Sequence, residues 1–294
     1  MKNRFKKLER SLFKYIPPAE RLLNRIVYRT ELSLIDGKHN NTNKHSSIIH
    51  FSVNKSATQY VKAILKKCAL KNGMVPVGIH NYAFNTEFPY LDTLSVEEME
   101  DYRHIFKSTG YLYSVFGGMV EGIPDLEDYK IVLVIRDPRD ILVSEYYSIA
   151  YSHIMPSEVG NKYNSFLSRR IAAKESTIDE YVISESARIY NVFFRYQTLL
   201  LDKYQNAFLT TYEQMVMDFD SWLTKLIEYC DLDIDRSFYQ QLLQENESKK
   251  PKEEDINKHN RKGVPGDYIN KLKPETIRKL DQKLEPILKL YHYQ

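Results

Sequence analysis

The sequence has few cysteines and no long apolar run, and both absences exclude whole classes of protein. Its only two cysteines, Cys68 and Cys230, form no CxxC pair, which excludes a disulfide framework and a cysteine zinc site. We expect both to be buried thiols. No stretch approaches the roughly 18 apolar residues of a membrane-spanning helix. The basic N-terminus is not followed by the apolar core of a secretory signal, so the sequence predicts a cytoplasmic protein.

The chain also lacks a large excess of charge of one sign. It has 42 basic and 39 acidic side chains among 294 residues, and its net charge is +3. A protein that coats nucleic acid would be far more basic, so no nucleic-acid partner is expected. Hydrophobic residues make up 43% of the chain, enough for a sizeable core, and the length fits one large or two small domains.

Residues 1–45 are predicted to form a basic helical extension and a linker in front of a main domain of residues 46–294. The start of this extension favours one or two amphipathic helices, interrupted at Pro17 and Pro18. Two interpretations are open. The helix contacts a membrane surface or a partner protein, or it packs on the main body.

From residue 47 onward, strand patterns and helix patterns alternate. Apolar runs predict five strands, at residues 48–53, 75–79, 111–116, 130–135 and 207–211. Helices are predicted around residues 61–68, from about Asp140, at 179–203, at 219–229 and from Pro274. Polar residues predict a partly helical surface insertion at 155–178 and a turn-rich stretch at 245–267. The alternation predicts an α/β fold, a three-layer sandwich with a central, mostly parallel sheet.

The first segment that can carry chemistry follows the first strand and contains Lys55. A strand gives way to a helix there, so several backbone N–H groups and the helix dipole point at one spot. Lys55 adds a positive charge, and Ser56 and Thr58 add hydroxyl donors. The glycines of a Walker A loop, GxxxxGK[ST], are missing. The segment predicts an anion site, and an ordinary strand-to-helix turn is the alternative.

The second segment, RDPRD, follows the clearest strand and begins at Arg136. Open α/β sheets bind ligands at the carboxyl ends of their strands, and a guanidinium can hold a phosphate through two hydrogen bonds. Ser144 lies in the next helix and is expected to donate to the same phosphate. Asp140 is predicted to be the N-cap of that helix, and Arg139 and Asp140 are expected only to shape the turn.

The third segment lies near the C-terminus, where Arg261 and Lys262 precede Gly263. The glycine allows the backbone to approach a ligand closely, and Gly266 makes a further turn. A solvated loop is the alternative interpretation of this segment taken alone.

In their order and separation, the three segments resemble the motifs of the PAPS-dependent sulfotransferase family, where PAPS is 3′-phosphoadenosine 5′-phosphosulfate. The resemblance covers about residues 47–294 and implies a fold like that of P-loop NTPases. It implies that the Lys55 turn holds the 5′-phosphosulfate, that the Arg136 and Arg261 segments hold the 3′-phosphate, and that Tyr212 lies near the adenine. The nucleotide-binding residues that it implies are Lys55, Ser56, Ala57, Thr58, Gln59, Arg136, Ser144, Tyr212, Arg261, Lys262 and Gly263.

The implied enzyme moves a sulfuryl group from PAPS to a hydroxyl or amine and releases adenosine 3′,5′-bisphosphate (PAP), without a metal. Lys55 is expected to neutralise the charge that grows on the bridging oxygen. A base must take the proton of the acceptor, and residues 111–116 lack the histidine that many family members carry there. We predict that His80 is the catalytic base. The alternatives are a carboxylate, His50, His104 and His153.

The predicted acceptor is a small molecule, because the 23 tyrosines of the chain can build an aromatic pocket. The aromatic residues in regions where the family binds acceptors are Phe84, Phe88, Tyr90, Tyr146, Tyr147 and Tyr151. Three alternatives are open: a carbohydrate sulfotransferase, a PAP-binding protein without catalysis, and a P-loop kinase of small metabolites. The family's dimer motif is not matched, so the oligomeric state is left open.

Overall fold

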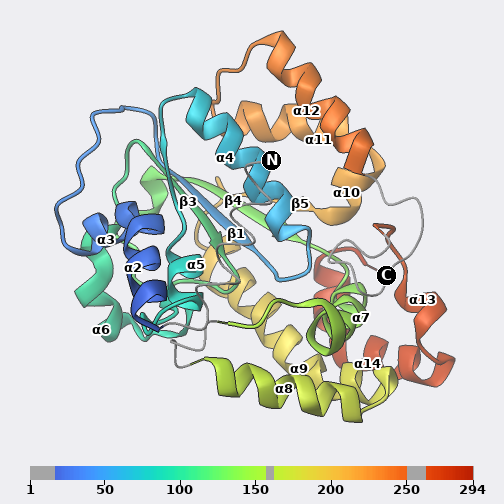
Figure 1. Ribbon diagram of the computed structural model, residues 1–294. Coiled ribbons are helices and arrows are strands. Elements are labelled where there is room, and N and C mark those ends of the chain that lie inside the picture. Colours follow the sequence, from blue (N-terminus) through green and yellow to red (C-terminus); the bar gives the residue numbers. More distant parts are fainter. Residues whose placement is uncertain (1–16, 157–161, 250–262, 294) are drawn as a thin grey trace.

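The computed structural model describes residues 17–156, 162–249 and 263–293. Its centre is a five-stranded sheet with the order β2-β3-β1-β4-β5, in which every neighbouring pair is parallel. The strands are β1 (Ile48–Ser52), β2 (Val75–Val77), β3 (Tyr111–Phe116), β4 (Lys130–Ile135) and β5 (Phe208–Thr211). Helices cover both faces of the sheet (Figure 1), which explains why β1 and β3 are buried at every position.

Four helices cover one face of the sheet and enclose the smaller of two cores. Ile48 and Leu112 of the sheet pack there against Leu65 and Leu223 of these helices. The helices are α4 (Thr58–Lys71), α10 (Tyr212–Met217), α11 (Phe219–Tyr229) and α12 (Arg236–Lys249).

Four other helices cover the opposite face, where Ile49 and Phe51 of β1 join the larger core. They are α7 (Pro138–Tyr147), α8 (Tyr163–Glu175), α9 (Ile178–Tyr196) and α14 (Pro274–Leu290). Glu145 of α7 links three of them, because it pairs with Arg169 of α8 at 3.4 Å and with Arg188 of α9. This pairing fixes α8 outside α7 and α9.

Short elements surround the edge of the sheet at β2, and residues near the N-terminus take part in them. Leu34 is buried in the larger core, and Glu31 accepts a hydrogen bond from the N–H of Gly78 at 2.7 Å. The expectation that this region packs on the main body is therefore confirmed for α3. The elements at this edge are α2 (Pro17–Val27), α3 (Arg29–Ile35), α5 (Ile79–Phe84), η1 (Leu91–Thr93), α6 (Val96–Met99) and η2 (Glu100–Ile105).

The remaining elements are short connections. They are η3 (Leu126–Asp128), the π-helical turns η4 (Ser148–Ser152) and η5 (Gln197–Leu201), and α13 (Tyr268–Lys271).

The predicted three-layer α/β fold, the five strands and the main helices are confirmed. The turn-rich prediction for 245–267 is wrong at its start, because α12 continues to Lys249. Contacts with α4 support that end of the helix: Lys67 pairs with Glu245 at 2.5 Å, and the Tyr60 hydroxyl donates to Asn246 at 2.8 Å. The domain boundary at residue 45 stays a prediction. Within the described ranges, no helix is both long and apolar enough to cross a bilayer.

Candidate functional site

The turn between β1 and α4 has an unusual backbone that suits an anion. Lys55 and Ala57 have positive φ angles of 75° and 57°, which residues other than glycine adopt mainly in constrained turns and functional sites. The N–H of Ser56 donates to the carbonyl of Val53 at 3.1 Å and closes the turn. The first N–H groups of α4 have no partner within the helix, and the helix dipole adds positive potential at the same place.

The side chains of this turn differ in what they can offer a ligand. Ser56 is fully buried, and its hydroxyl has no hydrogen-bond partner among the described residues. Such a group is costly unless a ligand or water satisfies it, so Ser56 fits a bound phosphate. The hydroxyl of Thr58 is instead engaged with that of Ser52 at 3.0 Å, and Gln59 is exposed.

Arg136 lies at the carboxyl end of β4 and is held on three sides. It donates from Nη2 to Asp140 at 3.0 Å and from Nη1 to the main-chain oxygen of Lys55 at 3.3 Å. Its guanidinium carbon is 4.3 Å from the centre of the Tyr212 ring. Its Nε is buried and has no partner in the part of the chain that the structure describes. The guanidinium is therefore fixed beside the Lys55 turn and retains a donor for a ligand.

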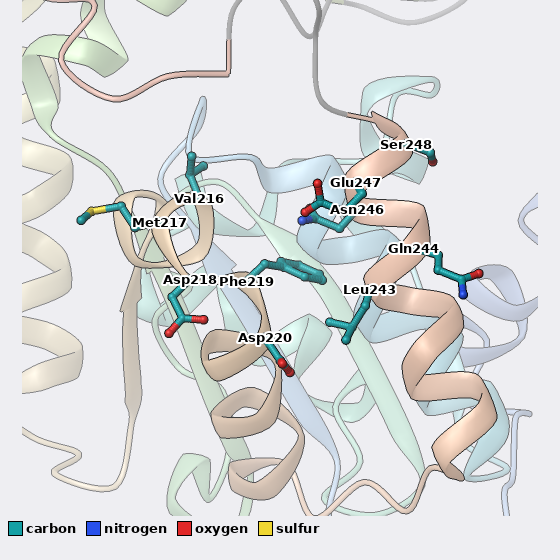
Figure 2. Close-up of a pocket in the computed structure, with 10 residues that line it drawn as sticks. All are labelled: Val216, Met217, Asp218, Phe219, Asp220, Leu243, Gln244, Asn246, Glu247 and Ser248. Atoms are coloured by element: carbon teal, nitrogen blue, oxygen red, sulfur yellow. The ribbon is translucent and has the colours of Figure 1, made fainter.

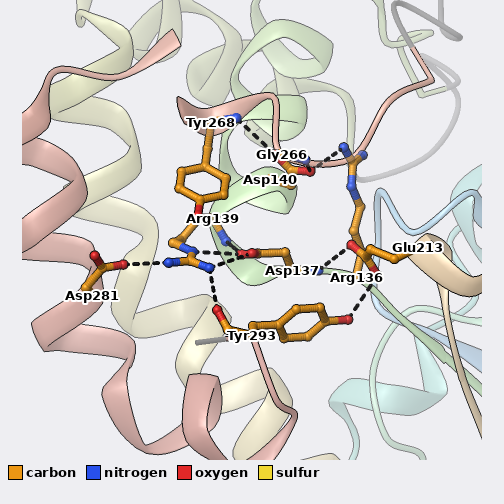
Figure 3. A network of polar contacts seen from close by, with 9 residues as sticks. All are labelled: Arg136, Asp137, Arg139, Asp140, Glu213, Gly266, Tyr268, Asp281 and Tyr293. Carbon is orange, nitrogen blue, oxygen red and sulfur yellow. Dashed lines mark hydrogen bonds and ion pairs between the residues drawn. The ribbon is translucent and has the colours of Figure 1, made fainter. Parts of the chain in front are cut away.

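Asp140 joins Arg136 to a segment more than 120 residues away, as Figure 3 shows. It accepts hydrogen bonds from the N–H groups of Gly266 at 2.8 Å and Tyr268 at 3.0 Å, in addition to that from Arg136. The prediction that Asp140 is the N-cap of α7 is wrong. Asp137 is the N-cap, because Pro138 occupies the first turn and Asp137 accepts from the N–H of Arg139.

Asp137 and Arg139 form the base of this corner. Arg139 pairs with Asp137 at 2.7 Å and with Asp281 at 2.8 Å, and Glu213 accepts from the N–H of Asp137 at 3.1 Å and from the hydroxyl of Tyr293 at 3.1 Å (Figure 3). Burial raises the pKa of Asp137, and Arg139 opposes this shift; burial also raises the pKa of Glu213. The sequence analysis missed Glu213, although a carboxylate directly after β5 falls at the same edge of the sheet as Arg136.

Two further predicted nucleotide residues lie near Arg136. Ser144 is half-buried on α7, four positions after Asp140, so the two residues share one face of the helix. Gly263 begins the described C-terminal segment, with a positive φ of 71°, and this segment reaches Asp140 through Gly266. Arg261 and Lys262 lie outside the described residues.

His80, the predicted base, lies in the first turn of α5. Its Nδ1 is 4.0 Å from Oδ1 of Asp92, and its ring stacks on Tyr90 with the centroids 4.6 Å apart. Burial lowers the pKa of His80, the Asp92 carboxylate opposes this shift, and the ammonium groups of Lys62 and Lys162 reinforce it. A histidine that is neutral at pH 7 can accept a proton.

The other candidate histidines have different surroundings. His50 is fully buried in β1 and bonds the hydroxyl of Ser114 at 2.9 Å, and burial, with a smaller effect of a nearby lysine, lowers its pKa to about 3. His104 donates to the carbonyl of Ile35 at 2.8 Å. Burial lowers the pKa of His153, and Lys55 is among the charges that lower it further. His80 and His153 therefore remain as candidates.

A groove of about 750 Å³ lies between α10–α11 and α12 (Figure 2). Phe219 and Leu243 face each other across it, and Asn246 projects from α12. Tyr60, in the first turn of α4, reaches the same place, because its hydroxyl bonds Asn246 and its ring centroid is 6.0 Å from that of Phe219. The sequence analysis did not single out Tyr60. Its position close after the Lys55 turn was the available signal, since aromatic rings stack well on nucleobases.

A parallel sheet with an anion-binding turn after one strand and a fixed arginine after the next defines a nucleotide-dependent enzyme of the P-loop type. A family model described as the sulfotransferase domain matches residues 45–292. The chain belongs to the sulfotransferase domain family, and it is a PAPS-dependent sulfotransferase that releases PAP. In the described parts of the chain, no group of three histidine, cysteine, aspartate or glutamate side chains is placed to hold a metal.

Solved structures agree in fold. Mouse sulfotransferase SULT7A1 complexed with PAP matches with a TM-score of 0.53 and 17% identity, over 87% of this chain and 88% of that chain. Retinol dehydratase in a complex with retinol and PAP matches with a TM-score of 0.49 and 12% identity, over 87% and 84% of the two chains. No curated protein sequence matches this chain.

Proposed function

We propose that the protein transfers the sulfuryl group of PAPS to a hydroxyl or amine of a small organic molecule, with the nucleotide held between the Lys55 turn and Arg136. One observation carries this proposal. The three segments meet, because Arg136 contacts the main chain of Lys55 while Asp140 ties Arg136 to Gly266. A nucleotide with a phosphate at each end needs two cationic pockets that open on one space.

The two ends of the nucleotide would use different groups. The 5′-phosphosulfate fits the Lys55 ammonium, the Ser56 hydroxyl and the N–H groups at the start of α4. The 3′-phosphate fits Arg136 and Ser144, with Arg261 and Lys262 arriving from the segment before Gly263. Lys55 would stabilise the negative charge that forms on the bridging oxygen as the bond to sulfur breaks. Tyr212 fits a role in holding Arg136, because the two groups stack.

We propose His80 as the base that takes the proton of the acceptor. Its carboxylate neighbour and its lowered pKa support this role, and His153 is the candidate against which it must be tested. Aromatic side chains gather on the same side of the molecule: Phe84 contacts His153 with ring centroids 6.0 Å apart, and Phe166 contacts it at 5.0 Å. These rings favour a small, partly apolar acceptor over a carbohydrate chain.

The N-terminal region supports a proposed contact with an anionic membrane surface. Residues 1–29 contain nine basic and two acidic side chains, although the net charge of the whole chain is only +3. On α2, Leu22 and Ile26 are 61% and 64% exposed, and Arg21 and Arg25 are exposed beside them. Exposed apolar residues next to basic ones are typical of helices that lie on anionic lipids.

Sedimentation with vesicles tests this contact. We expect the full chain to bind phosphatidylserine vesicles at low salt and to lose at least about tenfold in affinity when Arg21 and Arg25 are both replaced by Glu, since each basic residue contributes about 1 kcal/mol. The same double change at Lys279 and Lys283, on α14, is the control. Equal binding by both variants contradicts the contact.

We also propose a cytoplasmic location, which the cysteines support. Cys68 and Cys230 are unpaired thiols buried in the same core. Reduced thiols that are neighbours in a core are typical of a reducing compartment.

Transfer of label from [³⁵S]PAPS tests the proposed reaction. A panel of alcohols, phenols, amines and oligosaccharides is offered with and without protein, and we expect label on a small alcohol, phenol or amine. Label only on oligosaccharides favours the carbohydrate alternative. Tight binding of PAP without any transfer favours a binding protein without catalysis, and magnesium-dependent transfer of phosphate from ATP favours the kinase.

A further inference from the structure

The carboxylate of Asp92 faces the imidazole of His80 in a buried polar pair. Asp92 belongs to η1 and His80 to α5, and the 4.0 Å between Oδ1 and Nδ1 is slightly longer than a hydrogen bond. Both atoms are buried, and neither has another hydrogen-bond partner among the residues that the structure describes. Because buried polar atoms are normally paired, a small closing movement would satisfy both at once.

Gly118, which follows β3, fixes the other oxygen of Asp92. Its N–H donates to Oδ2 at 2.8 Å, and a Cβ at that position would lie only 2.8 Å from the same oxygen. Gly117 allows a similar approach by Asn54, whose amide nitrogen would be 2.9 Å from a Cβ. Since Asn54 precedes Lys55, the two glycines place Asp92 beside the turn that is proposed to hold the phosphosulfate.

Tyr90 and three charged groups surround the His80 ring. Tyr90 stacks on it, and the ammonium of Lys162 lies 4.8 Å from the centre of the tyrosine ring. Burial, opposed by Asp92 and reinforced by Lys62 and Lys162, keeps the pKa of His80 below its ordinary value. The ring is therefore neutral at pH 7, with one nitrogen that carries a proton and one that can accept a proton.

We propose that Asp92 is a positioning residue that holds the His80 proton on Nδ1, so that Nε2 takes the proton of the acceptor. This inference rests on the proposed function of His80. In the step, the acceptor oxygen or nitrogen bonds to sulfur while the bond from sulfur to the bridging oxygen breaks. The electron pair of that bond leaves with PAP, the proton of the acceptor moves to Nε2, and the Asp92 carboxylate stabilises the imidazolium that results.

Nitrogen NMR of the ligand-free protein tests the pair without turnover. We expect the His80 proton on Nδ1, and we expect Asp92→Asn to move it to Nε2. The reason is geometric: the oxygen of the new amide must accept from Gly118, so its NH₂ group faces Nδ1 and makes that nitrogen an acceptor. Asp101→Asn removes an exposed carboxylate of η2 and is the matched control. A His80 tautomer that Asp92→Asn leaves unchanged overturns the inference.

Kinetics supply the second readout. We expect Asp92→Asn to lower kcat about 100-fold with little change in the KM of the acceptor. The acid limb of kcat/KM should move to lower pH, because the carboxylate that raises the pKa of His80 is gone. In a His80→Gln background the same change should have no further effect. An equal loss in that background overturns the inference, and so does a larger loss of kcat from His153→Gln than from His80→Gln.

The two proposals fail in different ways. A protein that transfers no sulfuryl group to any acceptor loses the proposed function, and this inference with it. An active enzyme whose Asp92→Asn variant keeps its kcat and its pH profile loses only the role of Asp92.

Discussion

The corner around Arg136 and the region around His80 are built in opposite ways. Asp140, which holds Arg136, accepts three hydrogen bonds from groups far apart in the chain, and Asp137 and Arg139 form a second layer of ion pairs below it. At His80, the facing atoms of the ring and of Asp92 are 4.0 Å apart and unsatisfied among the described residues. One corner is braced, and the other is poised.

This difference matches the tasks that the two regions are proposed to perform. A phosphate that stays bound throughout the reaction is best held by groups that do not reorganise. A base must exchange a proton with each acceptor, so its partners gain their full strength only when the ring becomes charged. Rigidity at one end and unsatisfied groups at the other are thus two parts of one design.

Loss of the brace is expected to have the largest effect. Asp140→Ala leaves Arg136 buried without its ion-pair partner and removes the acceptor of two backbone N–H groups, so we expect the free energy of unfolding to fall by about 3–5 kcal/mol. Urea denaturation measures it. Asp281→Ala breaks a 43% exposed ion pair of the same network and should cost under about 1 kcal/mol. Similar losses for the two variants would contradict the contrast between a braced corner and its surface.

Removal of the guanidinium tests what the braced corner binds. Arg136→Ala is expected to weaken the binding of PAP by about 2–4 kcal/mol, because a phosphate loses charge-assisted hydrogen bonds. Calorimetry with PAP and with 5′-AMP measures this change, and the preference for PAP should shrink with it. Arg195→Ala, which removes the exposed partner of Glu121, is the control. An undiminished preference for the 3′-phosphate would sink the assignment of Arg136.

The Lys55 turn joins the two regions, and its lysine should affect turnover more than binding. Lys55→Ala is expected to lower kcat by about 100-fold, or about 2.7 kcal/mol, because the charge that it neutralises forms only in the transition state. The affinity for PAP should change little. Steady-state rates and calorimetry separate the two effects, with the exposed Lys66 of α4 replaced by Ala as the control. Turnover that survives the loss of Lys55 would contradict this role.

The fold could be predicted from the sequence because buried parallel strands are continuous apolar runs, and β1, β3 and β4 stand out for that reason. The phosphate segments were found because each follows a strand. The presence of Pro138 at the first helical position could also have identified Asp137 rather than Asp140 as the N-cap.

The pairings at the site could not be predicted in the same way. Asp140 bonds residues 126 and 128 positions later, and Asp92 lies in an irregular segment whose partner, Gly118, follows a different strand. No local pattern encodes contacts between segments that only the folded sheet brings together. The continuation of α12 to Lys249 depends in the same way on Tyr60 and Lys67 of α4.

A crystal structure of the complex with PAP tests most directly whether the two regions serve one nucleotide. We expect the 3′-phosphate within hydrogen-bond distance of Arg136 and Ser144, and the 5′-phosphate on the Lys55 turn, with its outer oxygens directed toward the side of His80. PAP bound only in the groove between α11 and α12, with neither phosphate on Arg136 or on the Lys55 turn, would contradict the account.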